Sequence, residues 1–488
     1  SMDSAVDDAR VQATVWLSMV MVVLAILTLI ASSYILIYFQ HEEDKNAAWA
    51  PKAVVMASLW LTMLTMLMLP LDTACARQFC LIPMEWMWIG ILLIDVVFLI
   101  LIIPFTVFYY ESNDPTEPGK SQFLDACKVL LLVGVPSLGL IGVAYLFLGR
   151  AEVPVTALYS PMLPTVNDTT FLAPPTLVDD PSFVFDDEVL DIRISVALYL
   201  IAMMSLLGSC AFACCGGIGL AALPSDLIQN FRFRPKVLNA QDFAKQRIAC
   251  GERATTLIEI GNKMMEAQYK KKGTRTKKDR KTFNRFKQNV YLLDEDWRKL
   301  SDAHHRRGAI VAGYYGQLLA GIVCTVMSLL WVAQAVTNLM MPEPPTGLLS
   351  DFFVSLDSGA LPFGSILFGI FAMYLLICMY KGNFKFGMRI FIGFEIHPMI
   401  IGRTLMNSFL FNCVMFILGS VAIAQICTKA FSTFVAGTQA AVMFNVAVDQ
   451  LIYVTYFWQV YHIFWITCAF FTVLGIMIWP SDRVELTN

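Results

Sequence analysis

The chain has 488 residues, of which 57% are hydrophobic and 15% are charged, with a formal net charge of −3 at pH 7. Soluble domains carry roughly 25% charged residues, so this composition excludes an ordinary soluble protein. The net charge averages two unlike parts, because the basic density lies mostly in the block Arg232–Arg307 and the rest is largely apolar.

Uninterrupted apolar runs, separated by short polar loops, fill most of the sequence. About 20 apolar residues in a helix cross the hydrocarbon core of a bilayer, and continuous runs favour helices over a barrel of alternating strands. We therefore predict an all-α fold, a polytopic helical membrane protein with about nine transmembrane helices. The predicted spans are Ala13–Phe39, Ala53–Leu71, Trp86–Tyr110, Val129–Leu148, Ile194–Leu223, Ala309–Val336, Phe363–Tyr380, Thr404–Ile426 and Val454–Trp479.

The distribution of Lys and Arg over the loops predicts the orientation, because basic residues favour the cytosolic side. It places the N-terminus in a lumen or outside the cell and the C-terminus in the cytosol. Asn167 begins an N-glycosylation acceptor, Asn-Asp-Thr, in a loop predicted to be outside. Cys75 and Cys80 lie in another such loop, where an oxidising compartment permits a disulfide; the alternative is two free thiols.

Three regions are predicted: 1–223 as a five-span membrane region, 224–308 as a cytosolic basic coiled-coil hairpin, and 309–488 as a four-span membrane region. Within the last region, 431–448 is apolar enough for a short tenth span. A re-entrant or interfacial element is preferred there, since a full span would move the C-terminus to the other side of the membrane.

The basic region contains apolar residues at alternating steps of three and four, which is typical of a coiled coil. Gly273 interrupts the pattern, so an antiparallel hairpin is predicted with the stretch YKKKGTRTKKDRK at its tip. A solvated tip fits this charge, and so does a docking site for anionic lipids or an acidic partner. Nucleic acid is not expected, because no recognition module accompanies the charge. The basic tip residues are Lys270, Lys271, Lys272, Arg275, Lys277, Lys278, Arg280 and Lys281.

One carboxylate lies in the middle of a predicted span, at Asp95 in the stretch GILLIDVVFLILIIPF. Ionised groups at that depth are costly and usually face the bundle interior or a wet cavity. Asp95 is therefore either a hydrogen-bonded structural group or a group that lines a path for a ligand or proton. Asp72, directly after the second predicted span, and Asp449, directly after the segment 431–448, are candidates for the same path.

Small residues recur every fourth position in the fifth predicted span, at Ser209, Ala213, Gly217 and Ala221. Such a stripe lets another helix approach closely, inside the bundle or in a homodimer. Cys210 and Cys214 nearby have the spacing of soft metal ligands, but small packing residues are the preferred interpretation and no metal is predicted. The sequence has no GxxxxGK[ST], HExxH or GxSxG motif, so an enzyme is not expected.

Three stretches together are similar to one known family. They are MLPLDTA at the end of the second span, IPFTVFYYESND at the end of the third, and GIGLAALPSDLI after the fifth. They resemble the limb-region and lipocalin-interacting-receptor membrane family, most of all its lysosomal cobalamin transport escort branch, over residues 15–480. This resemblance implies a lumenal or extracellular N-terminus, a cytosolic C-terminus and glycosylated outer loops. The resemblance implies no catalytic residues in this chain.

The resemblance also implies a function: a non-enzymatic transport escort or receptor of endomembranes, lysosomal or otherwise, or of the plasma membrane. Cobalamin is then the expected cargo rather than a catalytic cofactor. The expected partners are the lipid bilayer and either an ABC transporter of the D subfamily or a carrier-protein ligand. Two alternatives remain open, namely a gradient-driven transporter with an intramembrane acidic site, and an endocytic receptor or signalling scaffold.

Overall fold

The computed structural model describes residues 2–41, 44, 49–78, 80–111, 122–159, 184–232, 240–270, 309–341, 347–357, 362–386, 404–451 and 455–478, and parts of 286–301. Its contacts divide the chain into two units, 1–223 with 327–488 and 224–326. The first is called the membrane unit below and holds the candidate site. The three predicted regions, 1–223, 224–308 and 309–488, stay a prediction.

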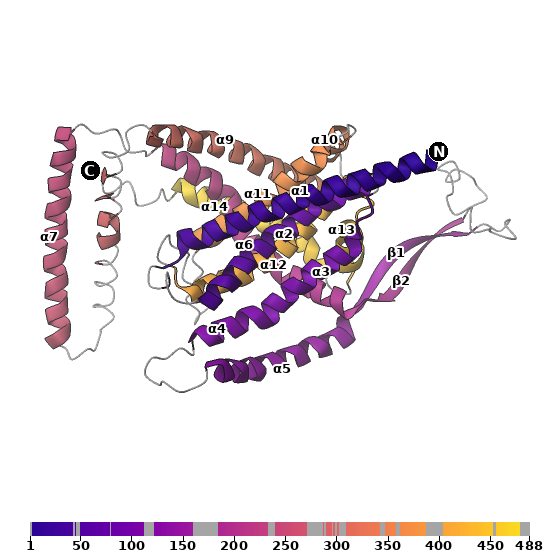
Figure 1. Ribbon diagram of the computed structural model, residues 1–488, viewed down its shortest axis with the longest axis horizontal. Helices are drawn as coiled ribbons and strands as arrows, with labels where there is room; N and C mark the ends of the chain where they lie inside the picture. Colours follow the sequence, from indigo (N-terminus) through magenta and orange to yellow (C-terminus); the bar gives the residue numbers. More distant parts are fainter. Residues whose placement is uncertain are drawn as a thin grey trace. The chain divides into compact units, whose positions relative to one another are not determined.

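Helices make up most of the membrane unit (Figure 1). Its helices in chain order are α1 (Met2–Phe39), α2 (Trp49–Gln78), α3 (Met84–Val97), the π-helix η2 (Phe98–Ile102), α4 (Ile103–Glu111), α5 (Gln122–Leu148), α6 (Val196–Arg232), α9 (Ala309–Ala335), the π-helix η5 (Val336–Met340), α10 (Leu348–Leu356), α11 (Phe363–Phe386), α12 (Met406–Ala430), α13 (Gln439–Ala441), the π-helix η6 (Val442–Val448) and α14 (Thr455–Ile478). Of these, α6 and α9 run from one unit into the other.

The polytopic helical fold class is confirmed. Eight helices in the described part of the chain are long and apolar enough to cross a membrane, with mean hydropathies of 2.0 to 2.9. They match the first eight predicted spans. The ninth predicted span coincides with α14, whose described stretch Val460–Ile476 is a shorter apolar helix. Most helices extend past the predicted limits, because α2, for example, continues through polar residues at both ends to Trp49 and Gln78.

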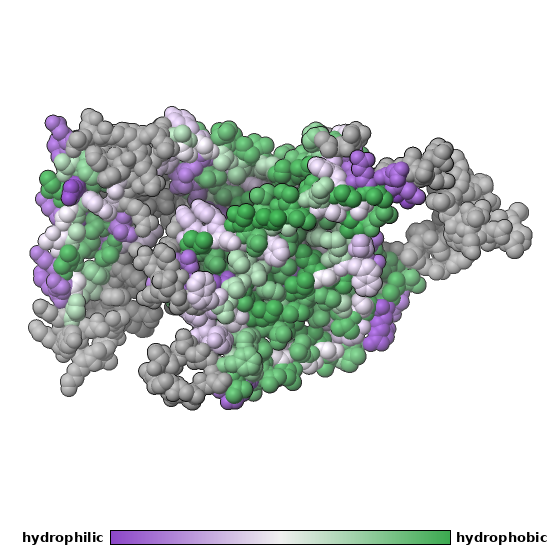
Figure 2. All heavy atoms as spheres, in the orientation of Figure 1, coloured by the Kyte–Doolittle hydropathy of each residue, from purple (hydrophilic) through white to green (hydrophobic). Residues whose placement is uncertain are grey.

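Three helices form the core of the membrane unit. The apolar windows of α2, α11 and α12 are 67%, 67% and 83% buried, whereas that of α5 is 0% buried and that of α1 is 11% buried. Hydrophobic residues cover most of the described face of this unit in Figure 2. Lipid is the solvent that suits such a surface, so α1 and α5 lie at the periphery and α2, α11 and α12 are surrounded by protein.

The helix that contains Asp95 changes its winding before Pro104. The α3 helix ends at Val97, the π-turn η2 follows, and α4 begins at Ile103. Proline has no N–H to donate and its ring clashes with the carbonyl four residues earlier, here Ile100. A single wider π-turn accommodates this clash without ending the helix.

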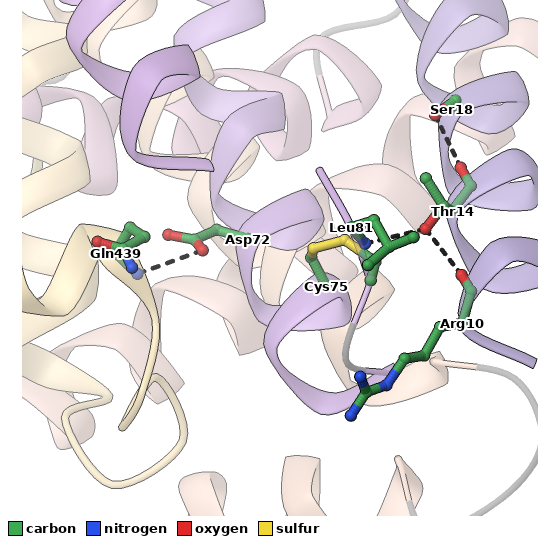
Figure 3. The surroundings of a disulfide bond; sticks show 8 residues. Arg10, Thr14, Ser18, Asp72, Cys75, Leu81 and Gln439 are labelled. Carbon is green, nitrogen blue, oxygen red and sulfur yellow. Dashed lines mark hydrogen bonds between the residues drawn. A yellow bond between two sulfur atoms is a disulfide. The ribbon is translucent and has the colours of Figure 1, made fainter. Parts of the chain in front are cut away.

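One end of the membrane unit is called the disulfide end below, because Cys75 and Cys80 are joined there with their Cα atoms 4.9 Å apart. Leu81, next to this bridge, donates its N–H to Thr14 Oγ1 on α1 at 3.0 Å (Figure 3). The N-terminus of α1 and the strands β1 and β2 lie at the same end (Figure 1).

Two strands, which were not predicted from the sequence, accompany the helices. Strands β1 (Arg150–Tyr159) and β2 (Val184–Arg193) form a two-stranded antiparallel sheet in register Arg150 to Arg193. Glu152 donates its N–H to the Gln450 carbonyl at 3.0 Å, which fastens the base of the sheet to the segment after η6. The glycosylation acceptor Asn167 lies outside the described residues.

The segment 431–448 contains no helix long enough to cross a membrane, and its re-entrant or interfacial placement stays a prediction. Its helical part, Gln439–Val448, has only 10 residues, about 15 Å of helix against the ~30 Å of a hydrocarbon core. Its apolar character serves packing instead, since Phe431 and Phe434 insert into a buried aromatic cluster with ring-centroid separations of 5.3 to 6.2 Å. The other rings of the cluster are Trp331, Phe353, Phe368 and Phe371.

Polar contacts close the opposite end of the membrane unit. Tyr110 donates to Asp44 Oδ1 at 2.9 Å, and the other oxygen of Asp44 accepts the N–H of Met406 at the start of α12. Asn407 donates to Glu111 Oε1 at 3.0 Å. Tyr110 and Glu111 belong to the FYYE stretch of the sequence resemblance, so part of that motif joins α4 to α12.

In the second unit, α7 (Ala240–Lys270) is a helix of 31 residues. Its Arg253 Nη1 lies 3.6 Å from Asp296 Oδ2, and a Cβ on Gly261 would lie 3.1 Å from the ring of Phe286. These contacts pair α7 with a segment that runs in the opposite direction. The coiled coil stays a prediction, and the tip residues Lys271–Lys281 lie outside the described residues. Burial raises the pKa of the Cys250 thiol in α7, with a smaller effect from Asp296.

Candidate functional site

Asp72, one of the three predicted intramembrane carboxylates, accepts hydrogen bonds from three donors. Trp88 Nε1 donates to Oδ2 at 2.9 Å, the Ala440 N–H to the same oxygen at 2.7 Å, and the Gln439 N–H to Oδ1 at 3.3 Å (Figure 3). The two backbone groups are the first N–H groups of the helical segment Gln439–Val448, which have no partner inside the helix. A carboxylate at a helix start satisfies them and opposes the helix dipole.

The local sequence explains why Asp72 reaches this position. It lies near the end of α2, at 2% exposure, directly after Pro70 and Leu71. Cys75 on the next turn closes the end of the helix through its disulfide with Cys80, and Figure 3 shows Asp72 directed toward Gln439. Thr438 completes the cap, because its hydroxyl accepts the Ala441 N–H at 3.2 Å. The MLPLDTA stretch therefore anchors the segment that follows α12.

A cavity of about 230 Å³ lies against this anchored segment. Three parts of the chain line it: the first turns of α3, the start of α6, and Gln439–Val448. Its walls are apolar, and Trp88, Ile89, Leu198, Ile201, Val442 and Met443 are among the residues that form them. Among the described lining residues, the polar ones are Glu85, Ser195 and Gln439, and all three are exposed. This cavity is called the α3–α6 pocket below.

Asp449 lies in a different network, at 7% exposure. Lys429 Nζ lies 2.6 Å from its Oδ2, and Gln425 Nε2 donates to its Oδ1 at 2.7 Å. Gln425 also accepts a hydrogen bond from the Ser205 hydroxyl. The carboxylate therefore connects the end of α12 to the segment after η6, and through Gln425 to α6.

The buried face of α14 carries polar groups that have no hydrogen-bond partner in the part of the chain that the structure describes. His462, at 3% exposure, has no partner on either ring nitrogen, although it lies within electrostatic reach of Lys429. Trp458 and Trp465 have no partner for Nε1. The hydroxyls of Tyr461 and Ser209 likewise have no hydrogen-bond partner by geometry among the described residues. Sequence reasoning missed this face, although aromatic and His residues at i, i+3, i+4 and i+7 are a readable signal.

Asp95 is fully buried in α3. Thr65 on α2 donates to its Oδ2 at 3.2 Å, and its Oδ1 has no hydrogen-bond partner. The structure does not bring the three carboxylates together in one site: Asp72 caps the segment 439–448, Asp449 pairs with Lys429, and Asp95 bonds to α2. Whether they line a path stays a prediction.

The small-residue stripe of α6 is buried at all four positions, Ser209, Ala213, Gly217 and Ala221. A Cβ on Gly217 would lie 2.6 Å from the Trp465 carbonyl oxygen, so the stripe packs against α14. Three glycines outside the predicted stripe lie even closer to neighbouring backbone than Gly217 does. Gly208 abuts the Leu418 carbonyl, Gly219 abuts the Cys378 carbonyl, and Gly382 abuts the Cys215 carbonyl. In the described part of the chain, no group of three or more His, Cys, Asp or Glu side chains could hold a metal ion.

Comparison with known proteins gives consistent matches over the length of the chain. Residues 17–299 and 294–477 match the family described as LMBR1-like membrane protein. A LIMR family protein of Dictyostelium discoideum is 35% identical, with 96% of this chain and 98% of the relative aligned. One from Oryza sativa subsp. japonica is 31% identical over 97% and 99%, and one from Arabidopsis thaliana is 28% identical over 92% of each chain. No solved structure matches.

Proposed function

Because the chain belongs to the family of LMBR1-like membrane proteins, we propose that it acts without catalysis, as a receptor or transport escort of an endomembrane. The membrane unit supplies a binding pocket at the disulfide end. The second unit, residues 224–326, supplies a basic surface for docking a partner. The pocket is the α3–α6 pocket, whose apolar walls and few polar rim groups are typical of ligand sites.

The contacts of Asp72 and Asp449 are the observation that carries this proposal. A gradient-driven transporter needs a carboxylate that exchanges its partner as an ion binds and leaves. Asp72 already accepts three hydrogen bonds, two of them from a helix start, and Asp449 accepts two from Gln425 and Lys429. Releasing either carboxylate would leave buried donors unpaired, at roughly 1–3 kcal/mol each. Both carboxylates are therefore expected to keep their present partners, which argues against a role in ion exchange.

Transport by the chain alone is the second candidate, and Asp95 favours it. Its Oδ1 is buried without a partner, and the π-turn η2 begins three residues later. π-turns inside helices are frequent at functional sites. Asp95 is the only one of the three candidate carboxylates with an unoccupied oxygen in the described residues.

Co-purification tests the receptor or escort role. Tagged full-length protein extracted from native membranes is expected to retain a stoichiometric membrane partner, which is lost when 240–301 is replaced by a flexible linker. The matched control is the eightfold substitution of the basic tip residues by Gln, which keeps the helical segments. The proposal is overturned if purified protein alone, in vesicles with a proton gradient, accumulates radiolabelled cobalamin and Asp95→Asn abolishes the accumulation.

The narrower assignments stay predictions, since the relatives are named for their family alone. These are cobalamin as cargo, the lysosome as location, an ABC transporter of the D subfamily or a carrier protein as partner, anionic lipids at the basic tip, and a homodimer. The same co-purification identifies the partner by mass spectrometry and so decides between the transporter and the carrier protein.

A further inference from the structure

The α3–α6 pocket lies at the first turns of two candidate membrane spans. It is lined by the first turns of α3 and α6, which begin at Met84 and Val196 where the chain enters the membrane. Trp86 in the first turn of α3 is 70% exposed, and tryptophan gathers at the depth of lipid head groups. A ligand in this pocket therefore places its apolar body among the helices and its head at the interface.

Glu85 is the one charged residue among the described residues that line the pocket. Its carboxylate is exposed and forms no hydrogen bond or ion pair with any described residue. Two cations at this end pair with other carboxylates, since Arg77 lies 3.3 Å from Asp357 and Arg150 pairs with Asp191. The Glu85 carboxylate is therefore open to a cationic group of a ligand.

The walls are held in place before any ligand arrives. Asp72 fixes the Trp88 indole on one wall and the start of Gln439–Val448 on another through the three hydrogen bonds described above. Leu198 at the third wall donates its N–H to the Ser195 hydroxyl at 3.2 Å. A pre-formed pocket binds its ligand without the cost of ordering its own side chains.

We propose that the α3–α6 pocket binds an amphiphile with a single apolar body and a protonated amino head group, and that Glu85 bonds to this head. The apolar walls take up the hydrocarbon through the hydrophobic effect. The ammonium group donates a charge-assisted hydrogen bond to the Glu85 carboxylate at the rim, and Ser195 and Gln439 are polar neighbours there. An anionic head group, such as that of a fatty acid, is repelled by the same carboxylate.

This proposal deepens the receptor role, since it names the class of ligand for the same pocket. The probe is radiolabelled dodecylamine, measured by equilibrium binding to the purified full-length protein in nanodiscs of uncharged lipid. We expect saturable binding at one molecule per chain, with dodecanoate about tenfold or more weaker. Glu85→Gln is expected to weaken amine binding about tenfold and to remove the preference over dodecanoate.

Three further variants keep the test decisive. Leu198→Trp fills the pocket and is expected to abolish saturable binding; Ala447→Leu narrows it and replaces the first variant if that one does not fold. Glu152→Gln removes an exposed carboxylate at the same end, outside the pocket lining, and is expected to bind as the wild type does.

The outcomes separate this proposal from the receptor role. Absence of saturable amine binding, equal binding of dodecanoate, or unchanged affinity in Glu85→Gln overturns the ligand assignment. If a membrane partner still co-purifies with the chain in that case, the receptor or escort role stands. If the amine binds as expected and no partner co-purifies, the pocket assignment stands and the escort role falls.

Discussion

Asp72 is a carboxylate within a helix long and apolar enough to cross a membrane. Its hydrogen-bond partners explain why it is there, without any role in transport. Its two oxygens satisfy three donors that would otherwise be buried in an apolar setting. Unpaired groups of this kind cost several kcal/mol inside a membrane protein. The residue therefore stabilises the helical segment after α12 and, through it, one wall of the α3–α6 pocket.

Asp72→Ala is expected to lower the free energy of unfolding by about 2–4 kcal/mol, because three donors lose their acceptor. Asp72→Asn is expected to cost less, since the amide keeps one acceptor oxygen. The measurement is the thermal unfolding midpoint of the purified protein in detergent. Asp125→Ala is the control, because Asp125 forms only a surface pair with Lys128 and such pairs contribute little. Equal midpoints for Asp72→Ala and Asp125→Ala would contradict the anchoring role.

The same residue shows the limit of sequence reasoning at this scale. Asp72 and Asp449 stand out in the sequence because each is a charged residue at the end of an apolar run. Their partners are not visible in the pattern, because the Gln439 N–H that bonds Asp72 lies 367 residues further along the chain. The α3–α6 pocket could not be predicted for the same reason, since three distant segments form it.

At the scale of elements, two helices meet through a reciprocal pair of glycines. Gly219 on α6 abuts the carbonyl of Cys378 on α11, and Gly382 on α11 abuts the carbonyl of Cys215 on α6. Small residues at such a crossing let backbones approach closely, which is how helices associate in lipid. The crossing holds α6 directly against the buried core helix α11.

Gly219→Ala and Gly382→Ala are each expected to destabilise the membrane unit, because the added methyl group would meet backbone that cannot move aside. Overpacking costs typically 1–3 kcal/mol, and backbone contact places these variants at the upper end. The recovery of monodisperse protein on size-exclusion chromatography measures the effect. Gly134→Ala on α5 is the control, because nothing lies within 4 Å of its Cβ position. Wild-type recovery of Gly219→Ala would show that the crossing is looser than described.

The sequence predicted the existence of the elements better than their limits. Membrane spans follow from composition alone, so the first eight predicted spans all correspond to long helices. Hydropathy reports only the part of a helix inside the hydrocarbon core, which is why α2 and α11 are longer than predicted. The sheet of β1 and β2 was missed because Pro154 interrupts the first strand, and proline argues against a strand when sequence is read alone.

At the scale of the whole molecule, the side on which the C-terminus lies depends on whether α14 crosses the membrane. The N-terminal part of α1 contacts the loop after the disulfide, and α12 starts at the opposite end, where Met406 bonds to Asp44. After α12 the chain stays at the disulfide end through 431–451, and α14 starts there. If α14 crosses, the two termini lie on opposite sides of the membrane, as the charge distribution predicts.

Glycosylation mapping tests this orientation in membranes. Asn167→Gln is expected to remove a glycan and raise the gel mobility of the protein, because the acceptor is predicted to be lumenal or extracellular. Lys272→Asn creates a new acceptor with Gly273 and Thr274 at the basic tip, and it is expected to gain no glycan. Enzymatic deglycosylation of each variant provides the control. A glycan on the Lys272→Asn variant would reverse the predicted orientation.

The packing of α14 on α6 also bears on how the chain is made. Ser209 and Gly217 of α6 are covered by a helix that the ribosome synthesises more than two hundred residues later. Until that last helix emerges, this seam faces lipid or a helper protein, with the Ser205 hydroxyl and Gln425 close by. A chain that stops before residue 455 is therefore expected to leave this face of α6 uncovered, the kind of feature by which quality control distinguishes incomplete membrane proteins from complete ones.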